Sequence, residues 1–395
     1  MACRLTQSIT RFSIFWALTL SCILALVSPV ATFALQATPQ INSPQETAFQ
    51  EIQVFAQALS LVKAADLRHR PDTFFLMSAL SAMAEAFDRY SHFIPPELLG
   101  LFVEQFRDQV TSIGIDVRSS GDQGIEVVSV APESPAQKAG VRPHDVITAV
   151  DGQSLAGLRV IDGLLLIHRP GLGPGTTLKL MIQKQGVGGT KTVSLTRELQ
   201  RRQTISARLL ERGYGILAIR AFMSATPADF RRAVQELEKA GPLVGMVIDL
   251  RGNPGGELSA AADVVRTLVK DGVITTTESQ FPDARFKLQA DGRDVFNWPA
   301  VVVVDGGSAS AAELVAGALK HHHRAVVIGE RTFGKGTFQS FIPIADDMGM
   351  YLTMGRYLLP DGSSVDGVGL DPEVHVKVMD DDQVMQVALR ILKKS

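Results

Sequence analysis

Residues 301–339 read VVVVDGGSASAAELVAGALKHHHRAVVIGERTFGKGTFQ, and this stretch decides the fold. Four consecutive valines form an apolar run suited to a buried parallel strand, and the Asp-Gly-Gly that follows indicates a sharp turn. Residues 311–320 are rich in Ala, Leu and Glu and predict a helix, while residues 325–328 predict a second buried strand. The stretch is therefore a βαβ unit, in which both strands run in the same direction.

Two chemically active residues follow these strands. Ser310 lies after the first strand and Lys335 after the second, so we expect both at the edge of the sheet where α/β proteins build their sites. A serine needs a base before it attacks a carbonyl, and a lysine is such a base when its amine is neutral. The ordinary pKa of lysine is about 10.4, so Lys335 must be buried for this chemistry near neutral pH. If residues 336–341 form a strand, Gln339 shares a face with Lys335 and can hold its amine in line.

Three motifs carry a family resemblance. SASAAE at 308–313, GERTFGKGTFQ at 329–339 and DLRGNPGG at 249–256 resemble the carboxyl-terminal processing proteases, which are serine–lysine endopeptidases of the S41 type. The resemblance covers nearly all of the chain after an N-terminal leader at residues 1–34. It implies an α/β multidomain fold, with a ClpP/crotonase-like α/β protease core, an inserted PDZ domain and an N-terminal helical region.

The resemblance also implies the site residues. Ser310 is expected to be the nucleophile, Lys335 the general base and Gln339 the residue that orients Lys335. The backbone N–H groups of Gly256 and Ala311 are expected to form the oxyanion hole. Glycines in that loop allow the backbone to approach a substrate closely, and the N-terminus of the helix after Ser310 favours negative charge.

Two positions depart from the family pattern. Asp305 stands where the family often has Asn, and Ala312 where it often has a second Ser. Neither lies on the proposed proton path, so we still expect activity. Ser308 competes with Ser310 as nucleophile, and Ser310 is preferred because it adjoins the helix N-terminus.

The composition describes an ordinary globular protein. The 395 residues suffice for two or three domains, with 46% hydrophobic residues, 20% charged residues and a formal net charge of −2. Without a basic excess, nucleic acid is not an expected partner. The two cysteines, Cys3 and Cys22, lie in the leader, so the mature chain is expected to have neither a disulfide nor a thiolate metal site. No cofactor is implied.

The leader, residues 1–34, has the layout of a secretory signal peptide. Arg4 and Arg11 precede an apolar run at 12–27, and small residues suggest cleavage at 32–34. An uncleaved membrane anchor is the alternative, although the run is short for a spanning helix. Cys22 lies in the middle of the run, which disfavours a lipoprotein site. We therefore expect an exported protein in the periplasm or an equivalent extracytoplasmic compartment, with membrane association through the leader if it is retained.

Between the leader and the PDZ domain, residues 35–46 are a polar linker and residues 47–100 an N-terminal helical region. Apolar residues at helical spacing predict a helical hairpin, which packs on the protease or pairs with another subunit. On this basis a homo-oligomer is expected. The sequence Asp-Arg-Tyr-Ser at 88–91 resembles the family segment that leads onward from this region, and no chemistry is expected of it.

Residues 101–190 resemble a PDZ domain. Such domains add a peptide as an extra strand and bind its carboxylate with backbone N–H groups. Ile113, Gly114 and Ile115 are the expected peptide-binding residues, with Gly114 in the carboxylate loop. Arg169 resembles the arginine that couples this domain to the protease in relatives, and a merely solvated Arg169 is an equal alternative.

Residues 191–380 are the predicted S41-type protease core and residues 381–395 a C-terminal helix. Within the core, the polar residues 283–297 predict a surface excursion. A phosphate-binding loop at 329–335 is disfavoured because Gly336 occupies the position where that motif needs Ser or Thr. The consecutive histidines at 321–323 fan apart on a helix end and are not expected to share a metal ion. Asp249 and Glu257 are a weaker candidate acid pair.

The sequence thus predicts an exported serine endopeptidase that cleaves proteins near their C-termini. The PDZ domain is expected to recognise the substrate C-terminus, so the partners are protein or peptide substrates, with an adaptor protein as a further candidate. The alternative is a catalytically inactive scaffold that binds peptides through its PDZ domain.

Overall fold

The computed structural model describes residues 46–394, with gaps at 122, 159, 170–171, 185–188, 212, 293–294 and 378–380. The predicted leader and all but the last residue of the predicted linker lie outside the described residues. Within the described ranges, no helix is both long and apolar enough to span a bilayer.

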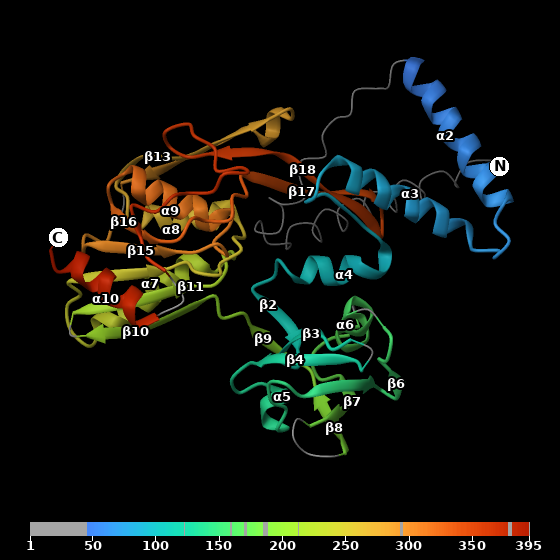
Figure 1. Ribbon diagram of the computed structural model, residues 1–395, viewed down its shortest axis with the longest axis horizontal. Coiled ribbons are helices and arrows are strands. Elements are labelled where there is room, and N and C mark those ends of the chain that lie inside the picture. Colours follow the sequence, from blue (N-terminus) through green and yellow to red (C-terminus); the bar gives the residue numbers. More distant parts are fainter. Residues whose placement is uncertain are drawn as a thin grey trace, which may run out of the picture.

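The predicted protease core is built on a six-stranded sheet with the order β10-β11-β12-β15-β16-β19 (Figure 1). Its strands are β10 (Ile205–Glu211), β11 (Tyr214–Ile219), β12 (Gly245–Asp249), β15 (Ala300–Val304), β16 (Ala325–Gly329) and β19 (Val374–His375). All neighbours are parallel except β10 and β11. The predicted βαβ unit is therefore present as β15, α9 (Ala311–His321) and β16.

Helices cover both faces of this sheet. They are α7 (Thr226–Glu238), α8 (Leu258–Arg266), α9 and α10 (Asp381–Leu392). Along β15, Val302 and Val304 belong to the same core as α7, α8 and α9, while Val301 and Val303 pack in a second core with α10. The run of four valines is apolar on both sides because each face of the strand is buried.

A second sheet packs on the outer side of α8 and α9 (Figure 1). Its order is β1-β18-β13-β14, with β17 also paired to β18. The strands are β1 (His92–Ile94), β13 (Asp271–Ser279), β14 (Lys287–Asp291), β17 (Thr337–Ala345) and β18 (Met348–Leu358), with a 3-10 turn η1 (Pro282–Ala284). Part of the expected surface excursion is thus ordered as β14, because β13 offers it a hydrogen-bonding edge.

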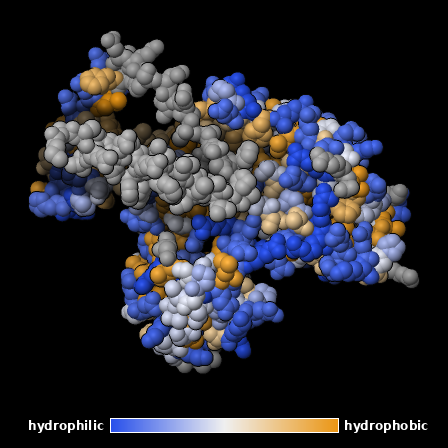
Figure 2. Space-filling model, turned by 180° about the vertical axis from the view of Figure 1, so that it is seen from behind, coloured by the Kyte–Doolittle hydropathy of each residue, from blue (hydrophilic) through white to orange (hydrophobic). Residues whose placement is uncertain are grey.

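The predicted PDZ domain is a separate lobe (Figures 1 and 2). Its sheet has the strand order β3-β4-β5-β7-β8. Its elements are β3 (Ile115–Ser119), β4 (Ile125–Val130), α5 (Pro135–Lys138), β5 (Val146–Val150), β6 (Gln153–Ser154), α6 (Val160–His168), β7 (Thr177–Gln183) and β8 (Thr190–Thr196). The chain enters through β2 (Gln109–Ser112) and leaves through β9 (Glu198–Arg201), which pair antiparallel. The domain is therefore an insertion held by a two-stranded neck.

The N-terminal region contains α2 (Glu46–Ala64), α3 (Asp72–Phe87) and α4 (Pro96–Glu104). Between α3 and α4, strand β1 pairs with β18 and so joins this region to the second sheet. On α4, the ring of Phe102 contacts Phe341 and Tyr351 at centroid distances of 5.3 and 5.0 Å. The N-terminal region is thereby fixed to the strands that follow Lys335.

Candidate active site

Ser310 lies at the junction between the turn after β15 and the first residue of α9. Its backbone adopts φ 56° and ψ −117°, and only 7% of the residue is exposed. Non-glycine residues rarely occupy this region, and holding one there costs about 1–3 kcal/mol. Such strain persists only where the surrounding structure imposes it, so the contacts around Ser310 identify what holds it.

The hydroxyl of Ser308 is committed to the turn. Its Oγ donates to the carbonyl of Leu250 at 2.8 Å and accepts the N–H of Asp305 at 3.0 Å, and the residue is fully buried. Ser308 therefore links β15 to the end of β12. This leaves Ser310 as the better candidate of the two serines.

A fully buried carboxylate, that of Glu313, joins Ser310 to the loop that carries Lys335. Its Oε2 accepts the N–H groups of Ser310 at 2.8 Å and Lys335 at 2.9 Å. Its Oε1 accepts the N–H of Gly334 at 2.8 Å and the hydroxyl of Thr332 at 2.5 Å. Four donors meet the need of a buried charge for partners, so this carboxylate is a structural clamp between the two segments.

A buried phenol ties the same two segments from the other side. The hydroxyl of Tyr357 lies 2.9 Å from the carbonyl oxygen of Ser310 and 3.1 Å from that of Lys335, and the two acceptors share its single hydrogen. Burial raises the pKa of Tyr357 well above its usual value, and the charges of Glu313 and Asp366 add to this effect. Tyr357 therefore stays a neutral donor over the working pH range.

Lys335 is half-buried, and its Nζ donates to Oε1 of Gln339 at 2.8 Å. Burial lowers the pKa of Lys335 below its ordinary value, while the nearby charge of Asp88 opposes that shift. Among the hydrogen bonds of the described residues, none joins Lys335 Nζ to the hydroxyl of Ser310. The structure thus brings Lys335 and Gln339 into direct contact and holds Ser310 to the same loop through the backbone.

The glycine loop after β12 docks on the turn that precedes Ser310. Asn253 is fully buried, and its carbonyl accepts the N–H of Ala309 at 2.9 Å. The carboxylate of Asp305 accepts the N–H of Gly252 at 2.9 Å. At Gly255, where φ is +104°, an added Cβ would lie 2.8 Å from Cβ of Ser310. Only glycine fits here, because the loop backbone packs directly against the candidate nucleophile.

Gly256 and Ala311 lie on either side of the contact between the glycine loop and the turn that carries Ser310. Gly256 has φ +134° and packs against the backbone of Phe222, which leaves no space for a Cβ. Ala311 is the first residue of α9. In the part of the chain that the structure describes, neither N–H donates to a protein acceptor, so both are available donors near Ser310.

The candidate acid pair of Asp249 and Glu257 is not supported as a catalytic arrangement. Asp249 is 2% exposed, and both of its oxygens are held by the guanidinium of Arg251, each at 2.9 Å. Burial raises the pKa of Glu257, and the charge of Asp108 adds to this. Asp249 therefore anchors the start of the glycine loop through a bidentate ion pair.

In the PDZ domain, the candidate peptide-binding residues lie at the start of β3, an edge strand of its sheet. Ile113 is buried in the domain core, Gly114 has φ +79°, and Ile115 begins β3. The N–H of Gly114 donates to Oγ of Ser112 at 2.9 Å. A peptide carboxylate that binds at this loop has to replace Oγ of Ser112 as the acceptor of the Gly114 N–H.

Arg169 lies at the end of α6 and forms an ion pair with Asp151 at 3.5 Å. Its side chain is 44% exposed. Both partners belong to the PDZ domain, so in this structure Arg169 is paired within its own lobe.

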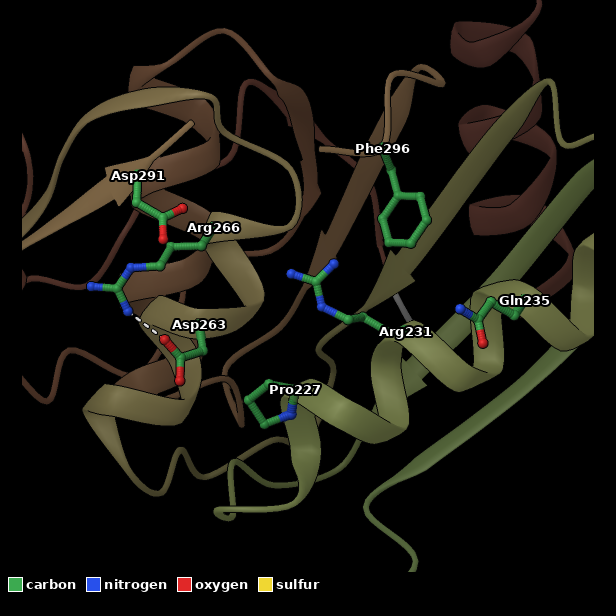
Figure 3. A pocket seen from close by; sticks show the side chains of 7 residues that line it. All are labelled: Pro227, Arg231, Gln235, Asp263, Arg266, Asp291 and Phe296. Carbon is green, nitrogen blue, oxygen red and sulfur yellow. Dashed lines mark hydrogen bonds and ion pairs between the residues drawn. The ribbon is translucent and has the colours of Figure 1, made fainter. Parts of the chain in front are cut away.

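No group of His, Cys, Asp and Glu side chains within the described ranges is arranged to hold a metal ion. His322 instead contacts the carbonyl of Val273 at 2.7 Å through Nε2. A polar pocket of about 720 Å³ lies between α7, α8 and β14 (Figure 3). It is lined by Pro227, Arg231, Gln235, Asp263, Arg266, Asp291 and Phe296, none of which is a sequence-predicted site residue.

Sequence reasoning did not identify Glu313 or Tyr357. The spacing of Ser310 and Glu313 matches the pattern of a capping box, Ser-x-x-Glu, which is a local signal that could have singled out Glu313. That local signal says nothing of the Lys335 loop, which the same carboxylate also binds. Tyr357 gave no local signal because its partners are distant in the sequence.

Fold and site together describe an α/β core with a candidate serine–lysine site and an inserted second lobe. Residues 213–376 match the model of peptidase family S41, and residues 103–183 match that of the PDZ domain. The chain belongs to family S41, and within it to the carboxy-terminal processing proteases, which are serine-type peptidases.

Individual relatives support this assignment. The chain is 32% identical over 331 residues to the chloroplastic C-terminal processing peptidase of Tetradesmus obliquus, covering 80% of this chain and 70% of the relative. It is 30% identical over 355 residues to the carboxy-terminal processing protease CtpB of Bacillus subtilis, covering 88% and 72%. The solved structure of a photosystem II D1 C-terminal processing protease is similar, with 28% identity, a TM-score of 0.51 and coverage of 86% of this chain and 97% of that one.

The contacts of Glu313 predict that replacing one of its carboxylate oxygens by an amide NH₂ group strongly lowers stability and activity. Glu313→Gln places an NH₂ group against N–H donors, which leaves buried groups unpaired. We expect the free energy of unfolding to fall by about 1–3 kcal/mol and kcat/KM to fall by about 10²-fold as Ser310 and Lys335 shift. Urea unfolding and peptide cleavage measure the two effects. Asp305→Asn is the matched control because it keeps the Oδ1 acceptor, and equal losses in both variants would contradict the clamp.

Proposed function

We propose that Ser310 and Lys335 form a serine–lysine catalytic pair that hydrolyses peptide bonds near the C-termini of proteins. The observation that carries the proposal is the double tie between the two residues. Glu313 binds both backbone N–H groups, and the hydroxyl of Tyr357 binds both carbonyls. A pair held in this way by two buried side chains is preorganised for a joint role.

In the proposed course, Oγ of Ser310 attacks the scissile carbonyl carbon and its proton passes to the neutral Nζ of Lys335. The resulting oxyanion accepts hydrogen bonds from the N–H groups of Gly256 and Ala311, each typically worth about 2.7–4 kcal/mol. Lys335 then gives the proton to the leaving amine, and an acyl-enzyme remains. Water attacks the ester, Lys335 takes its proton and returns one to Ser310, and the acid product leaves.

Gln339 supports this course by fixing the amine. Its Nε2 donates to the hydroxyls of Thr337 and Thr353, each at 3.1 Å. These two bonds direct Oε1 toward Lys335, where it accepts one amine hydrogen. A neutral amine so held presents its lone pair away from Gln339.

Delivery of a free C-terminus is assigned to the PDZ domain. Support comes from the open edge of β3, which can pair with an added strand, and from the loop of Ile113, Gly114 and Ile115 at its start. The substrate class is therefore a protein or peptide with an accessible C-terminal carboxylate.

Export is the proposed route to the site of action. Its support is the leader at 1–34, with two arginines before an apolar run and small residues at its end. The proposed location is the periplasm or an equivalent extracytoplasmic compartment.

The catalytic pair predicts distinct results for two substitutions. Ser310→Ala removes the nucleophile, and Lys335→Arg keeps a cation that cannot lose its proton. We expect both to reduce peptide cleavage to background while peptide binding, measured by fluorescence anisotropy, stays within about twofold of wild type. In wild type, kcat/KM rises with pH as Lys335 loses its proton, and burial places that rise below the ordinary lysine pKa. Full activity in either variant would refute the catalytic pair.

A second prediction concerns the substrate. Amidation of the C-terminus removes the charge that the PDZ loop binds, so we expect KM to rise by about tenfold with kcat less affected. Matched peptides that differ only in this group supply the measurement. Identical kinetics would assign substrate selection to another surface.

Export is tested with a reporter that is active only outside the cytoplasm. We expect residues 1–45 fused to such a reporter to give activity, because the apolar run directs translocation. The double variant Leu20→Arg, Leu24→Arg breaks the run and should abolish the signal. Equal reporter activity from both fusions would contradict the proposal.

A further inference from the structure

The segment at residues 88–91 reaches the active site from the N-terminal region. Its last residue, Ser91, is fully buried, and its Oγ accepts the N–H of Thr353 on β18 at 3.0 Å. The following strand β1 pairs with β18 through His92 and Tyr351. Asp88 closes the turn, since its Oδ1 accepts the N–H groups of Tyr90 at 2.7 Å and Ser91 at 2.8 Å. The segment is therefore a fixed part of the second sheet.

Tyr90 covers the amine of Lys335. Nζ of Lys335 lies 5.0 Å from the centroid of the Tyr90 ring, within the range of a cation–π contact. The guanidinium of Arg89 lies 4.7 Å from the same ring and 5.8 Å from that of Phe333. The ring face that meets Lys335 favours an ammonium over a neutral amine.

A chain of hydrogen bonds leads from Lys335 to Thr353, beside the turn that Asp88 closes. Lys335 Nζ donates to Oε1 of Gln339, and Nε2 of Gln339 donates to the hydroxyl of Thr353. Thr353 is also the strongest of the groups that hold the pKa of the Asp88 carboxylate down, and its own N–H donates to Ser91, whose N–H donates to Asp88. The amide that holds the amine is therefore fixed by a residue that borders the 88–91 turn.

We propose that Asp88 and Tyr90 are positioning residues of the active site, which orient Lys335 and stabilise the ammonium formed when it takes the proton of Ser310. This proposal rests on the catalytic pair proposed above. The acting base must be neutral at first and charged after the transfer. Burial keeps the amine of Lys335 neutral at first. The carboxylate of Asp88 and the ring of Tyr90 then stabilise the ammonium that forms.

The pKa shifts of Lys335 and Asp88 support these separate roles of burial and of the Asp88 charge. Burial lowers the pKa of Lys335, and Asp88 is the charge that opposes it. Burial also acts on Asp88 and raises its pKa, but hydrogen bonds from Thr353, Tyr90 and Ser91 outweigh it and keep that pKa below its usual value. Asp88 is therefore ionised at neutral pH.

Other titratable groups pack near Lys335 from several elements. Glu313 of α9 accepts its backbone N–H, Tyr357 of β18 donates to its carbonyl, and the Asp366 carboxylate accepts the N–H of Gly336 at 3.0 Å. Arg89 reaches the Tyr90 ring from the segment itself. The contacts of Glu313, Tyr357 and Asp366 involve neither Asp88 nor Tyr90 and remain when either is substituted. The contact of Arg89 is lost only with the Tyr90 ring, so a shift of the pH profile in Asp88→Asn reports on Asp88 alone, and one in Tyr90→Leu reports on the ring together with its Arg89 contact.

The experiment compares pH profiles of kcat/KM for wild type, Asp88→Asn and Tyr90→Leu. Asn keeps the Oδ1 acceptor of the turn and removes the charge, while Leu keeps an apolar cover and removes the ring. Each change makes Lys335 less basic, so we expect the acid limb to move to lower pH by about 0.5–1 unit. The plateau should fall by about three- to tenfold because a weaker base transfers the proton less well. Tyr90→Phe keeps the ring and should restore the position of the limb.

The chain offers a matched control for each change. Tyr214 lies beneath another lysine, with Nζ of Lys393 at 5.8 Å from its ring, and Asp361 closes another turn through Ser363. Tyr214→Leu and Asp361→Asn should leave the limb in place. A second readout, acylation of the Lys335 amine against pH in the Ser310→Ala background, follows the same charge state without turnover.

The outcomes separate the two proposals. An active Lys335→Arg enzyme would overturn the catalytic pair and this inference with it. If Lys335→Arg is inactive while Asp88→Asn and Tyr90→Leu lose activity equally at every pH, the pair stands and the two residues are only structural. If either variant unfolds, the other variant and the acylation profile still decide.

Discussion

The structure depends on one buried carboxylate with four donors. Glu313 lies in the first turn of α9, yet its side chain binds the backbone of Ser310 and that of the loop at 332–335. A buried carboxylate is costly unless fully paired, so the loop cannot leave without exposing an unpaired charge. The strained backbone of Ser310 is held by the same bond. One interaction therefore sets both the conformation of the candidate nucleophile and the place of its candidate base.

Each of the two sheets supplies different residues of the candidate site around Glu313. The parallel sheet supplies Ser310 and the glycine loop from the carboxyl ends of β15 and β12, as α/β folds do. The antiparallel sheet supplies Gln339 from β17 and Tyr357 from β18. Helices α8 and α9 lie between them, so the site forms where the outer sheet meets the N-terminus of α9.

Local sequence patterns predicted the elements whose partners are close in the chain. The four valines, the turn and the Ala-rich helix identified the βαβ unit and, with it, the edge that carries Ser310 and Lys335. The choice of Ser310 over Ser308 as nucleophile stays a prediction, and the structure commits the Ser308 hydroxyl to Leu250. Contacts across long separations gave no such signal. No chemistry was expected of the segment at 88–91, because its contacts with Thr353 and Lys335 join residues that are far apart in the sequence.

The pairing of β1 with β18 has a consequence for the growing chain. The bond between Ser91 and Thr353 spans 262 residues, so the early strand has no partner until nearly the whole polypeptide has been synthesised. Closing such a span delays its pairing relative to the local βαβ contacts. The frame that holds Gln339 and Tyr357 therefore includes a strand from each end of the chain, and it is complete only after β18 has been synthesised and has paired with β1.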